Sequence, residues 1–229
     1  MTNINLYGTI GYTILQNPET KQQIIIFADR HDNLPHCTNS IKIADWFKEK
    51  MYSSKILLEE VPRNTVELEE LWTDSEHTQD LKKLFLDNST IINGLDIRPF
   101  LIPFSWELAQ PTEPTHNITM RKYCWKINEF FTLSNFLKLE LTEFNPEKLA
   151  GTKLGNHFLQ LKNNFKKILE NNSEFLNFSI CTIKNINLEF LELINKLLDQ
   201  IMEWYICAQI HQVNNKSIIV HAGLAHSDQ

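Results

Sequence analysis

Four short apolar segments, separated by stretches with helical periodicity, constrain the fold of this chain more than any other feature. They are rich in β-branched residues and cover residues 23–28, 56–58, 90–97 and 216–223. Continuous apolar runs of this length are typical of strands that are buried on both faces, as in parallel sheets. Strands that alternate with helices predict right-handed crossovers. We therefore expect an α/β fold with a mainly parallel β-sheet flanked by helices.

The segments between these strands carry helix signals. Apolar spacing and capping residues predict helices over residues 41–51, 64–72 and 75–87, and the clearest helical stripe covers residues 188–211. At the N-terminus, residues 4–15 alternate between apolar and polar positions, which predicts a strand or an irregular hairpin.

The long helical stretch determines the expected domain organisation. Residues from about 115 to 213 are almost wholly helical in pattern, and the strand at 216–223 follows them. That last strand needs a sheet to join. We therefore expect a single α/β domain over residues 1–229, with its core at 1–110 and 214–229 and a large helical insertion at about 115–213 before the last strand.

Composition and charge narrow the classes of protein that fit. The chain has 22 basic and 28 acidic residues, a net charge of −6, so a nucleic-acid partner is not expected. Its four cysteines form no CxxC pair, which argues against a disulfide framework or a structural zinc knuckle. Residues 1–5 do not begin a signal peptide, and no apolar run reaches the roughly 20 residues that span a bilayer. We expect a cytoplasmic protein that does not enter a membrane.

Polar and ionisable residues stand at the end of each predicted strand. The strand-end segments are 28–32 (Ala-Asp-Arg-His-Asp), 59–60 (Glu-Glu), 96–98 (Asp-Ile-Arg) and 221–226 (His-Ala-Gly-Leu-Ala-His). In open α/β sheets, ligands bind beyond the carboxyl ends of the strands, and the carboxyl ends of parallel strands meet at one edge. The sequence therefore predicts a functional site at this edge.

Metal-assisted hydrolysis is the chemistry that best suits this set of residues. His31, Glu60 and His226 supply the imidazole and carboxylate ligands that bind Mn²⁺, Co²⁺ or Zn²⁺. A metal with an open position lowers the pKa of bound water and yields a nucleophile near neutral pH. Arg98 has the geometry to hold a substrate carboxylate or phosphate, or to stabilise an oxyanion. The same groups also suit direct acid–base catalysis without a metal.

Several of these residues have a second interpretation. Glu59 and Glu60 are adjacent and point to opposite faces of a strand, so at most one of them reaches the centre of the site, and Glu60 is our choice. Arg98 also suits an ion pair with a carboxylate at the sheet edge. His221 lies within the last strand and is expected to be a core histidine.

The remaining polar residues have less specific roles. Two interpretations suit Asp29, Asp32 and Asp96 equally well. They support neighbouring site residues, or they cap a turn. His36 and Cys37 are explained best as residues of a helix-entry loop. The histidines interpreted as surface or packing residues are His77, His116, His157 and His211.

Two short motifs resemble those of a known superfamily. Gly223-Leu224-Ala225-His226 fits a GxxH motif after a strand, and Ala28-Asp29-Arg30-His31 fits the same motif with Ala in place of Gly. A strand-end glutamate and a strand-end arginine lie between them. This set resembles the superfamily that unites the TraB/TIKI-like proteins, the ChaN-like haem-binding lipoproteins and the erythromycin esterases. The likeness covers the sheet-forming segments, about half of the chain.

The resemblance implies a set of roles for this chain. His31 and His226 would be catalytic or metal-binding, Glu60 their carboxylate partner, and Arg98 the arginine of the family pattern. It favours a metal-dependent hydrolase that acts on a peptide, ester or small anionic substrate. ChaN-like members bind haem, so a non-catalytic protein that holds haem or another planar ligand is the first alternative, and a protein-interaction module on the same fold is the second.

Overall fold

The computed structural model describes most of the chain, in several ranges: 5–30, 32, 38–62, 75–101, 118–133, 149–214 and 217–223. Two compact units make up the chain. Unit 1 contains residues 1–96 and 210–229, and unit 2 contains residues 97–209. In the predicted organisation, too, a helical insertion separates the two parts of the core along the chain. That they form one domain stays a prediction.

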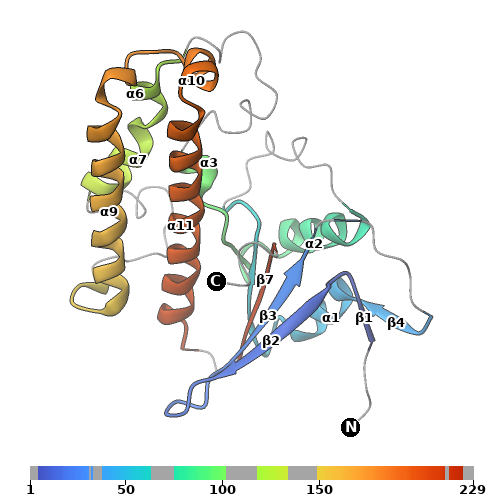
Figure 1. Cartoon of the computed structure of the whole chain (residues 1–229). Coiled ribbons are helices and arrows are strands. Elements are labelled where there is room, and N and C mark those ends of the chain that lie inside the picture. Colours follow the sequence, from blue (N-terminus) through green and yellow to red (C-terminus); the bar gives the residue numbers. More distant parts are fainter. Residues whose placement is uncertain are drawn as a thin grey trace. The chain divides into compact units, whose positions relative to one another are not determined.

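A five-stranded sheet forms the centre of unit 1, with the strand order β2-β3-β7-β5-β6 (Figure 1). Its strands are β2 (Gly11–Gln16), β3 (Gln23–Asp29), β5 (Lys55–Leu58), β6 (Asn93–Gly94) and β7 (Ser217–Gly223). β2 runs antiparallel to β3, and all other neighbouring pairs are parallel. The predicted α/β fold with a mainly parallel sheet is confirmed.

The N-terminal segment forms two separate pairings. β1 (Asn5–Tyr7) pairs in parallel with β4 (Ser40–Lys42), outside the main sheet. The hairpin instead joins β2 to β3, and its turn is closed by the side chain of Asn17, which accepts hydrogen bonds from the backbone N–H groups of Glu19 and Thr20 at 2.9 and 3.0 Å. An Asn side chain that bonds its own backbone in this way favours a turn.

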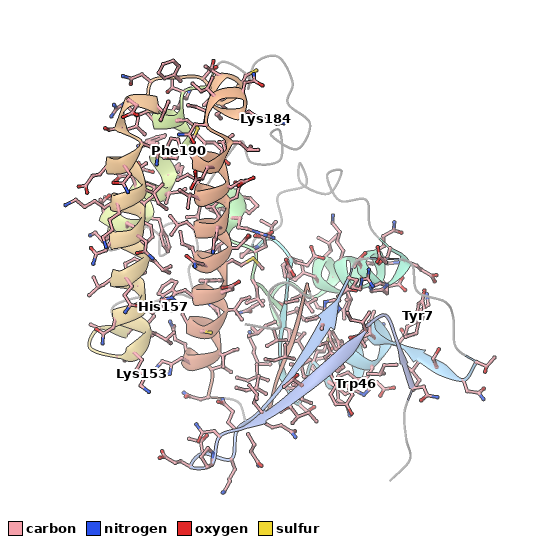
Figure 2. All side chains as sticks on the ribbon, viewed as in Figure 1. Tyr7, Trp46, Lys153, His157, Lys184 and Phe190 are labelled. Carbon is pink, nitrogen blue, oxygen red and sulfur yellow. The ribbon has the colours of Figure 1, made fainter. Side chains whose placement is uncertain are left out.

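The core of unit 1 lies between the sheet and two helices, α1 (Ile43–Lys50) and α2 (Glu76–Asp87). Both helices bury an apolar stripe against the strands. Trp46 of α1 packs edge-on against Phe27 of β3, with ring centroids 5.5 Å apart (Figure 2). The buried members of this core come mostly from β3, α1, β5, α2 and β7, and they include Phe27, Ile43, Phe47, Ile56, Leu58, Leu81, Phe85, Ile92 and Ile219.

The third predicted strand is shorter than its apolar pattern indicates. Of residues 90–97, only Asn93 and Gly94 pair with β5. Ile92, Leu95 and Ile97 are fully buried nonetheless. The apolar run indicated burial, and burial alone does not require strand pairing. Gly94 lies so close to the backbone of Glu60 and Pro62 that any side chain there would collide with it.

The regular elements in the described residues of unit 2 are helices, as the sequence predicts. They are α3 (Arg98–Leu101), α6 (Met120–Tyr123), α7 (Trp125–Thr132), α9 (Lys153–Asn171), a 3₁₀ turn (Ser173–Phe175), α10 (Ile180–Ile186) and α11 (Leu188–Gln212), whose last residues belong to unit 1. Phe190 of α11 is fully buried (Figure 2). An aromatic cluster joins α7, α9 and α11 through Phe130, Phe131, Phe158, Phe165 and Trp204.

Local capping determines where several of these helices begin. The side chain of Thr152 accepts a hydrogen bond from the Gly155 N–H at 3.1 Å, and that of Ser179 accepts one from the Thr182 N–H at 3.2 Å. Such caps satisfy backbone donors that the first helical turn leaves open. Among the helices of the described ranges, none is long and apolar enough to cross a membrane.

Candidate functional site

The carboxyl ends of the strands of unit 1 meet at one edge of the sheet. Asp29, the last residue of β3, is in register with Gly223, the last residue of β7. On the other side of β7, Leu58 is in register with His221, and the next residue, Glu59, donates its N–H to the His221 carbonyl at 3.0 Å. The predicted convergence of strand ends at one edge is therefore present in the described residues.

The strand order brings the described starts of the two motif segments side by side. β7 comes last in the chain, yet it lies between β3 and β5 in the sheet. The first GxxH-type segment thus leaves a strand that is adjacent to the strand from which the second segment leaves. On the far side of β5, the Asp96 N–H donates to the Glu60 carbonyl at 3.1 Å, so the third strand-end segment also reaches this edge.

A buried carboxylate–imidazole pair lies at this edge. Asp29 Oδ1 is 2.7 Å from Nε2 of His77, which lies in the first turn of α2, and each side chain is 1% exposed. The Ser75 hydroxyl also lies beside the ring, 3.0 Å from His77 Nδ1 and 3.3 Å from Nε2. A carboxylate acceptor at Nε2 favours the Nε2–H form of the ring. The structure thus gives His77, which we expected to be a surface or packing residue, a polar contact in the interior.

These three residue types invite comparison with a nucleophilic triad, but their geometry does not fit one. Ser75 Oγ is 3.0 Å from Nδ1 and 3.3 Å from Nε2 of His77, so it does not lie on the axis of either nitrogen alone. Ser75 is also buried, and its hydroxyl lies 3.0 Å from that of Thr78. A serine nucleophile needs access to substrate and a base that is aligned with its proton. Ser75 is therefore a partner of the His77 ring.

His221 lies on the other side of Asp29. Its Nε2 is 3.9 Å from Asp29 Oδ2, and its ring packs edge-on against Phe47 with centroids 6.1 Å apart. The side chain is buried within β7, which confirms the expected core position of this histidine. Asp29 therefore lies between two imidazoles, one from α2 and one from β7. Of the two roles considered for Asp29, this position favours support of neighbouring side chains over capping of a turn.

The structure distinguishes the two glutamates at the end of β5. The Glu59 carboxylate accepts a hydrogen bond from the Gly223 N–H, so it holds the first residue of the second motif. Glu60 uses its backbone at this edge, where its N–H donates to the Leu58 carbonyl at 2.7 Å and its carbonyl accepts from Asp96. The contact of Glu59 with Gly223 is a feature that the sequence analysis did not identify. The assignment of Glu60 to the reaction centre stays a prediction.

Arg98 is described within unit 2, where it begins α3. Its guanidinium donates to Asp199 Oδ1 of α11 at 3.1 Å, and its side chain is 18% exposed. This carboxylate comes from a helix, whereas the alternative interpretation expected one from the sheet edge. An arginine that holds a carboxylate through its planar group is restricted in orientation.

Two of the predicted site residues, His31 and His226, lie outside the described residues, as do His36 and Cys37. Near the first of them, Arg30 and Asp32 form an exposed pair with 3.5 Å between Nε and Oδ2. Within the described ranges, no group of three or more His, Cys, Asp and Glu side chains is arranged to hold a metal ion. That His31 and His226 take part in a metal site stays a prediction.

The outer side of α2 is fixed by a second set of charges. Lys42 of β4 donates to Asp80 at 2.8 Å and to Glu76 at 2.9 Å, and these hydrogen bonds, that to Asp80 first, raise the pKa of the lysine. The three side chains are partly exposed, so the network adds little to stability. These ion pairs join β4 to the helix that carries His77.

The position of His77 had a signal in the sequence. Ser75 is expected to begin the second of two helices between the strands at 56–58 and 90–97, and the structure confirms a helix at that position, α2 at residues 76–87. In such folds the helix that follows a strand begins near the carboxyl edge of the sheet. A histidine in the first helical turn was therefore a candidate for the site.

Comparisons of this chain with models of protein families, with curated proteins and with solved structures found no match in any of the three.

Proposed function

We propose that this chain is a hydrolase, of the type represented by the TraB/TIKI-like proteins and the erythromycin esterases. Its reaction centre would lie at the carboxyl ends of β3, β7 and β5. The observation that supports this most is the strand order, because β7 separates β3 from β5 and is parallel to both. His31 follows Asp29 by two residues and His226 follows Gly223 by three, so both histidines belong to segments that leave adjacent strands.

The described residues supply a framework for this chemistry. Asp29 with His77 fixes the end of β3, and Glu59 with Gly223 ties the end of β5 to the end of β7. Fixed strand ends are what a reaction centre requires, since catalytic groups must be held in the productive geometry before substrate arrives. In this proposal, His31, Glu60 and His226 are the acid, base or metal-binding groups.

The donor set fits a divalent metal by its chemistry. Two imidazoles and a carboxylate are ligands that Mn²⁺, Co²⁺ and Zn²⁺ accept, and His31, Glu60 and His226 would hold the ion. When bound, such an ion activates water and polarises the scissile carbonyl or phosphoryl group. Arg98 would bind an anionic part of the substrate through its planar group of N–H donors. The substrate is a small molecule or a peptide, and the expected cytoplasmic location stays a prediction.

Metal content is the first test of this proposal. The full chain is incubated with Mn²⁺, Co²⁺ or Zn²⁺, dialysed and analysed for bound metal, and its hydrolysis of p-nitrophenyl acetate and of a short peptide is measured. We expect about one metal per chain in the wild type and little in the His31→Ala and His226→Ala variants. His157→Ala is the matched control, because His157 is an exposed histidine on α9 (Figure 2).

The two glutamates extend this test. If Glu60 serves the reaction, Glu60→Gln lowers turnover at least about 100-fold, whereas Glu59→Gln, which keeps an acceptor for the Gly223 N–H, has the smaller effect. The reverse order would move the catalytic role to Glu59. A wild-type chain that binds none of the three metals and hydrolyses neither substrate contradicts the hydrolase proposal. A Soret band on haem titration would then support the ligand-binding alternative.

A further inference from the structure

We propose that His77 is a positioning residue of this centre. It would fix the Asp29 carboxylate and thereby the end of β3, from which the chain continues to His31. The inference rests on the proposed function, because it concerns the same sheet edge. His77 is not part of either GxxH-type segment, and 48 residues separate it from Asp29 in the sequence. Its role is argued from contacts of described residues alone.

The helix does not need this contact in order to dock. α2 packs against the core of unit 1 through Leu81, Leu84 and Phe85, all of which are buried. By comparison, a polar pair that is almost fully removed from water adds little net stability, since the loss of hydration offsets the attraction between its members. An apolar pair of similar volume would hold α2 equally well. Attachment of α2 to the core therefore does not explain why Asp29 and His77 are buried together.

The surroundings of His77 hold its ring in one orientation. Gly8 has a φ of 107°, and a Cβ atom at that position would lie 2.7 Å from His77 Cβ, so the backbone after β1 packs directly against the histidine. Tyr7 meets the ring edge-on, with centroids 6.3 Å apart. Ser75 lies at Nδ1. A donor confined on three sides presents its Nε2–H to Asp29 in one fixed direction, which is how supporting groups position functional ones.

The Asp29 carboxylate faces an imidazole at each oxygen. Oδ1 faces His77 Nε2 at 2.7 Å, and Oδ2 faces His221 Nε2 at 3.9 Å. Asp29 is also in register with Gly223, whose N–H is held by Glu59. Removal of the His77 donor would release one side of this arrangement and leave the strands, and the contact between Glu59 and Gly223, unchanged.

Carbethoxylation of His31 by diethyl pyrocarbonate tests the inference on the full chain. The rate of modification of each histidine is followed by mass spectrometry of peptides, so no substrate has to be known. We expect the rate at His31 to change at least about fivefold in His77→Phe, and to stay within about twofold of wild type in His77→Gln, whose amide N–H can still donate to Asp29. His157 serves as the internal reference for reagent concentration.

Leu81→Ala is the matched control for loss of stability. It weakens the packing of α2 and leaves the Asp29–His77 hydrogen bond intact, so it should not alter the rate at His31. Should His77→Phe fail to fold, the double variant Asp29→Leu/His77→Phe, which removes both members of the hydrogen bond, is expected to change the rate in the same way. Equal rates at His31 in wild type and His77→Phe would overturn the inference, and so would equal changes in His77→Phe and His77→Gln or in His77→Phe and Leu81→Ala.

The outcomes also separate this inference from the proposed function. If the wild type hydrolyses neither p-nitrophenyl acetate nor the peptide and binds no metal, the proposed function fails, and the His31 rates still decide whether His77 positions the segment after β3. If the wild type is active, we expect His77→Phe to lower kcat about tenfold with KM within about twofold, because a displaced group acts on the transition state more than on binding.

Discussion

The two units of this chain differ in where they keep polar groups. Unit 2 has an interior of aliphatic and aromatic side chains, in which Phe130, Phe158 and Trp204 pack together. Unit 1 has an apolar core of similar kind and, in addition, a set of buried polar side chains. Of the buried polar residues in the described ranges, only Gln209 belongs to unit 2, and the others are Asp29, Ser54, Ser75, His77, Thr78, Asp96 and His221.

Under the proposed function, this difference favours unit 1 as the unit that carries the reaction centre. Burial of polar groups is costly unless they are hydrogen-bonded, so a fold that only has to be stable avoids it, as unit 2 does. In unit 1 three ionisable members of the set, Asp29, His77 and His221, lie together at the carboxyl ends of the strands. Their concentration at the edge where α/β folds bind ligands is better explained by a site than by packing.

The largest predicted effect comes from breaking the buried pair of unit 1. Asp29→Ala leaves the His77 donor in the interior without its carboxylate, and we expect a loss of about 3–5 kcal/mol in the free energy of unfolding. The double variant Asp29→Leu/His77→Phe removes both polar groups and should recover most of that loss. Urea unfolding, followed by circular dichroism, measures both values.

The double variant also sharpens the comparison between the units. A stable double variant without turnover would mean that the polar pair serves function, as the contrast with unit 2 suggests. If the double variant were as unstable as Asp29→Ala, the pair would be an essential part of the fold of unit 1. The contrast with the apolar interior of unit 2 would then carry no information about chemistry.

Two glycines with positive φ provide a second comparison, one from each unit. Gly8 in unit 1 has a φ of 107° and packs against His77 and Ile43, whereas Gly151 in unit 2 has a φ of 78° and open space around it. Alanine in place of Gly8 meets both strain and collision, with an expected loss of about 2–3 kcal/mol. Alanine in place of Gly151 meets only the backbone strain, with a loss of about 1 kcal/mol. Thermal unfolding of the two variants measures the difference.

The difference between the two glycines depends on the tight contact around His77. If Gly8→Ala cost no more than Gly151→Ala, the backbone after β1 would have room to move away, and His77 would not be confined on that side. Such a result would weaken the contrast between a rigid edge in unit 1 and an ordinary helix entry in unit 2. A larger loss in Gly8→Ala that shrinks in the His77→Gly background, which removes the Cβ atom that the added methyl meets, would identify the histidine as one source of the collision.

Much of the fold could be predicted because local pattern determines it. The predicted strand at 23–28 corresponds to β3, 56–58 to β5 and 216–223 to β7, each within about one residue, since continuous β-branched runs have few alternatives. The helix predicted at 188–211 corresponds to α11 for the same reason. Residues 40–42, in contrast, pair with β1, although we expected the helix of α1 to begin there. That pairing depends on a segment that is distant in the sequence, which no local pattern reveals.

The candidate site could be predicted only in part. The rule about carboxyl ends of strands located the edge, and the structure brings Asp29, Glu59 and Gly223 together there. The position of β7 between β3 and β5 is a property of topology, and local sequence does not specify it. Asp29 and His77 are 48 positions apart in the sequence, so local sequence does not specify their contact either. The choice between Glu59 and Glu60 depends on backbone geometry at the end of β5, where strand alternation no longer applies.

The smallest predicted effect concerns unit 2 and alkaline pH. Cys124 is buried between α6 and α7, and burial raises the pKa of its thiol from 9.0 to about 12. Below pH 9 the thiol is neutral in both the folded and the unfolded chain, so its contribution to stability is fully present. Above pH 9 the unfolded chain ionises first, and stability is lost as the pH rises toward 12. At about pH 10 we expect a loss of about 1 kcal/mol from this group.

A comparison of wild type with Cys124→Ala isolates this contribution, because all other titrating groups are common to both chains. Urea unfolding at about pH 8 and about pH 10 should show a steeper loss in the wild type, and hydrogen exchange should show the change within residues 120–131. If wild type and Cys124→Ala lost the same stability between these two pH values, the thiol would not be shielded from water. The apolar interior of unit 2 would then admit solvent near α6, and the contrast with the polar edge of unit 1 would be smaller than the burial of Cys124 indicates.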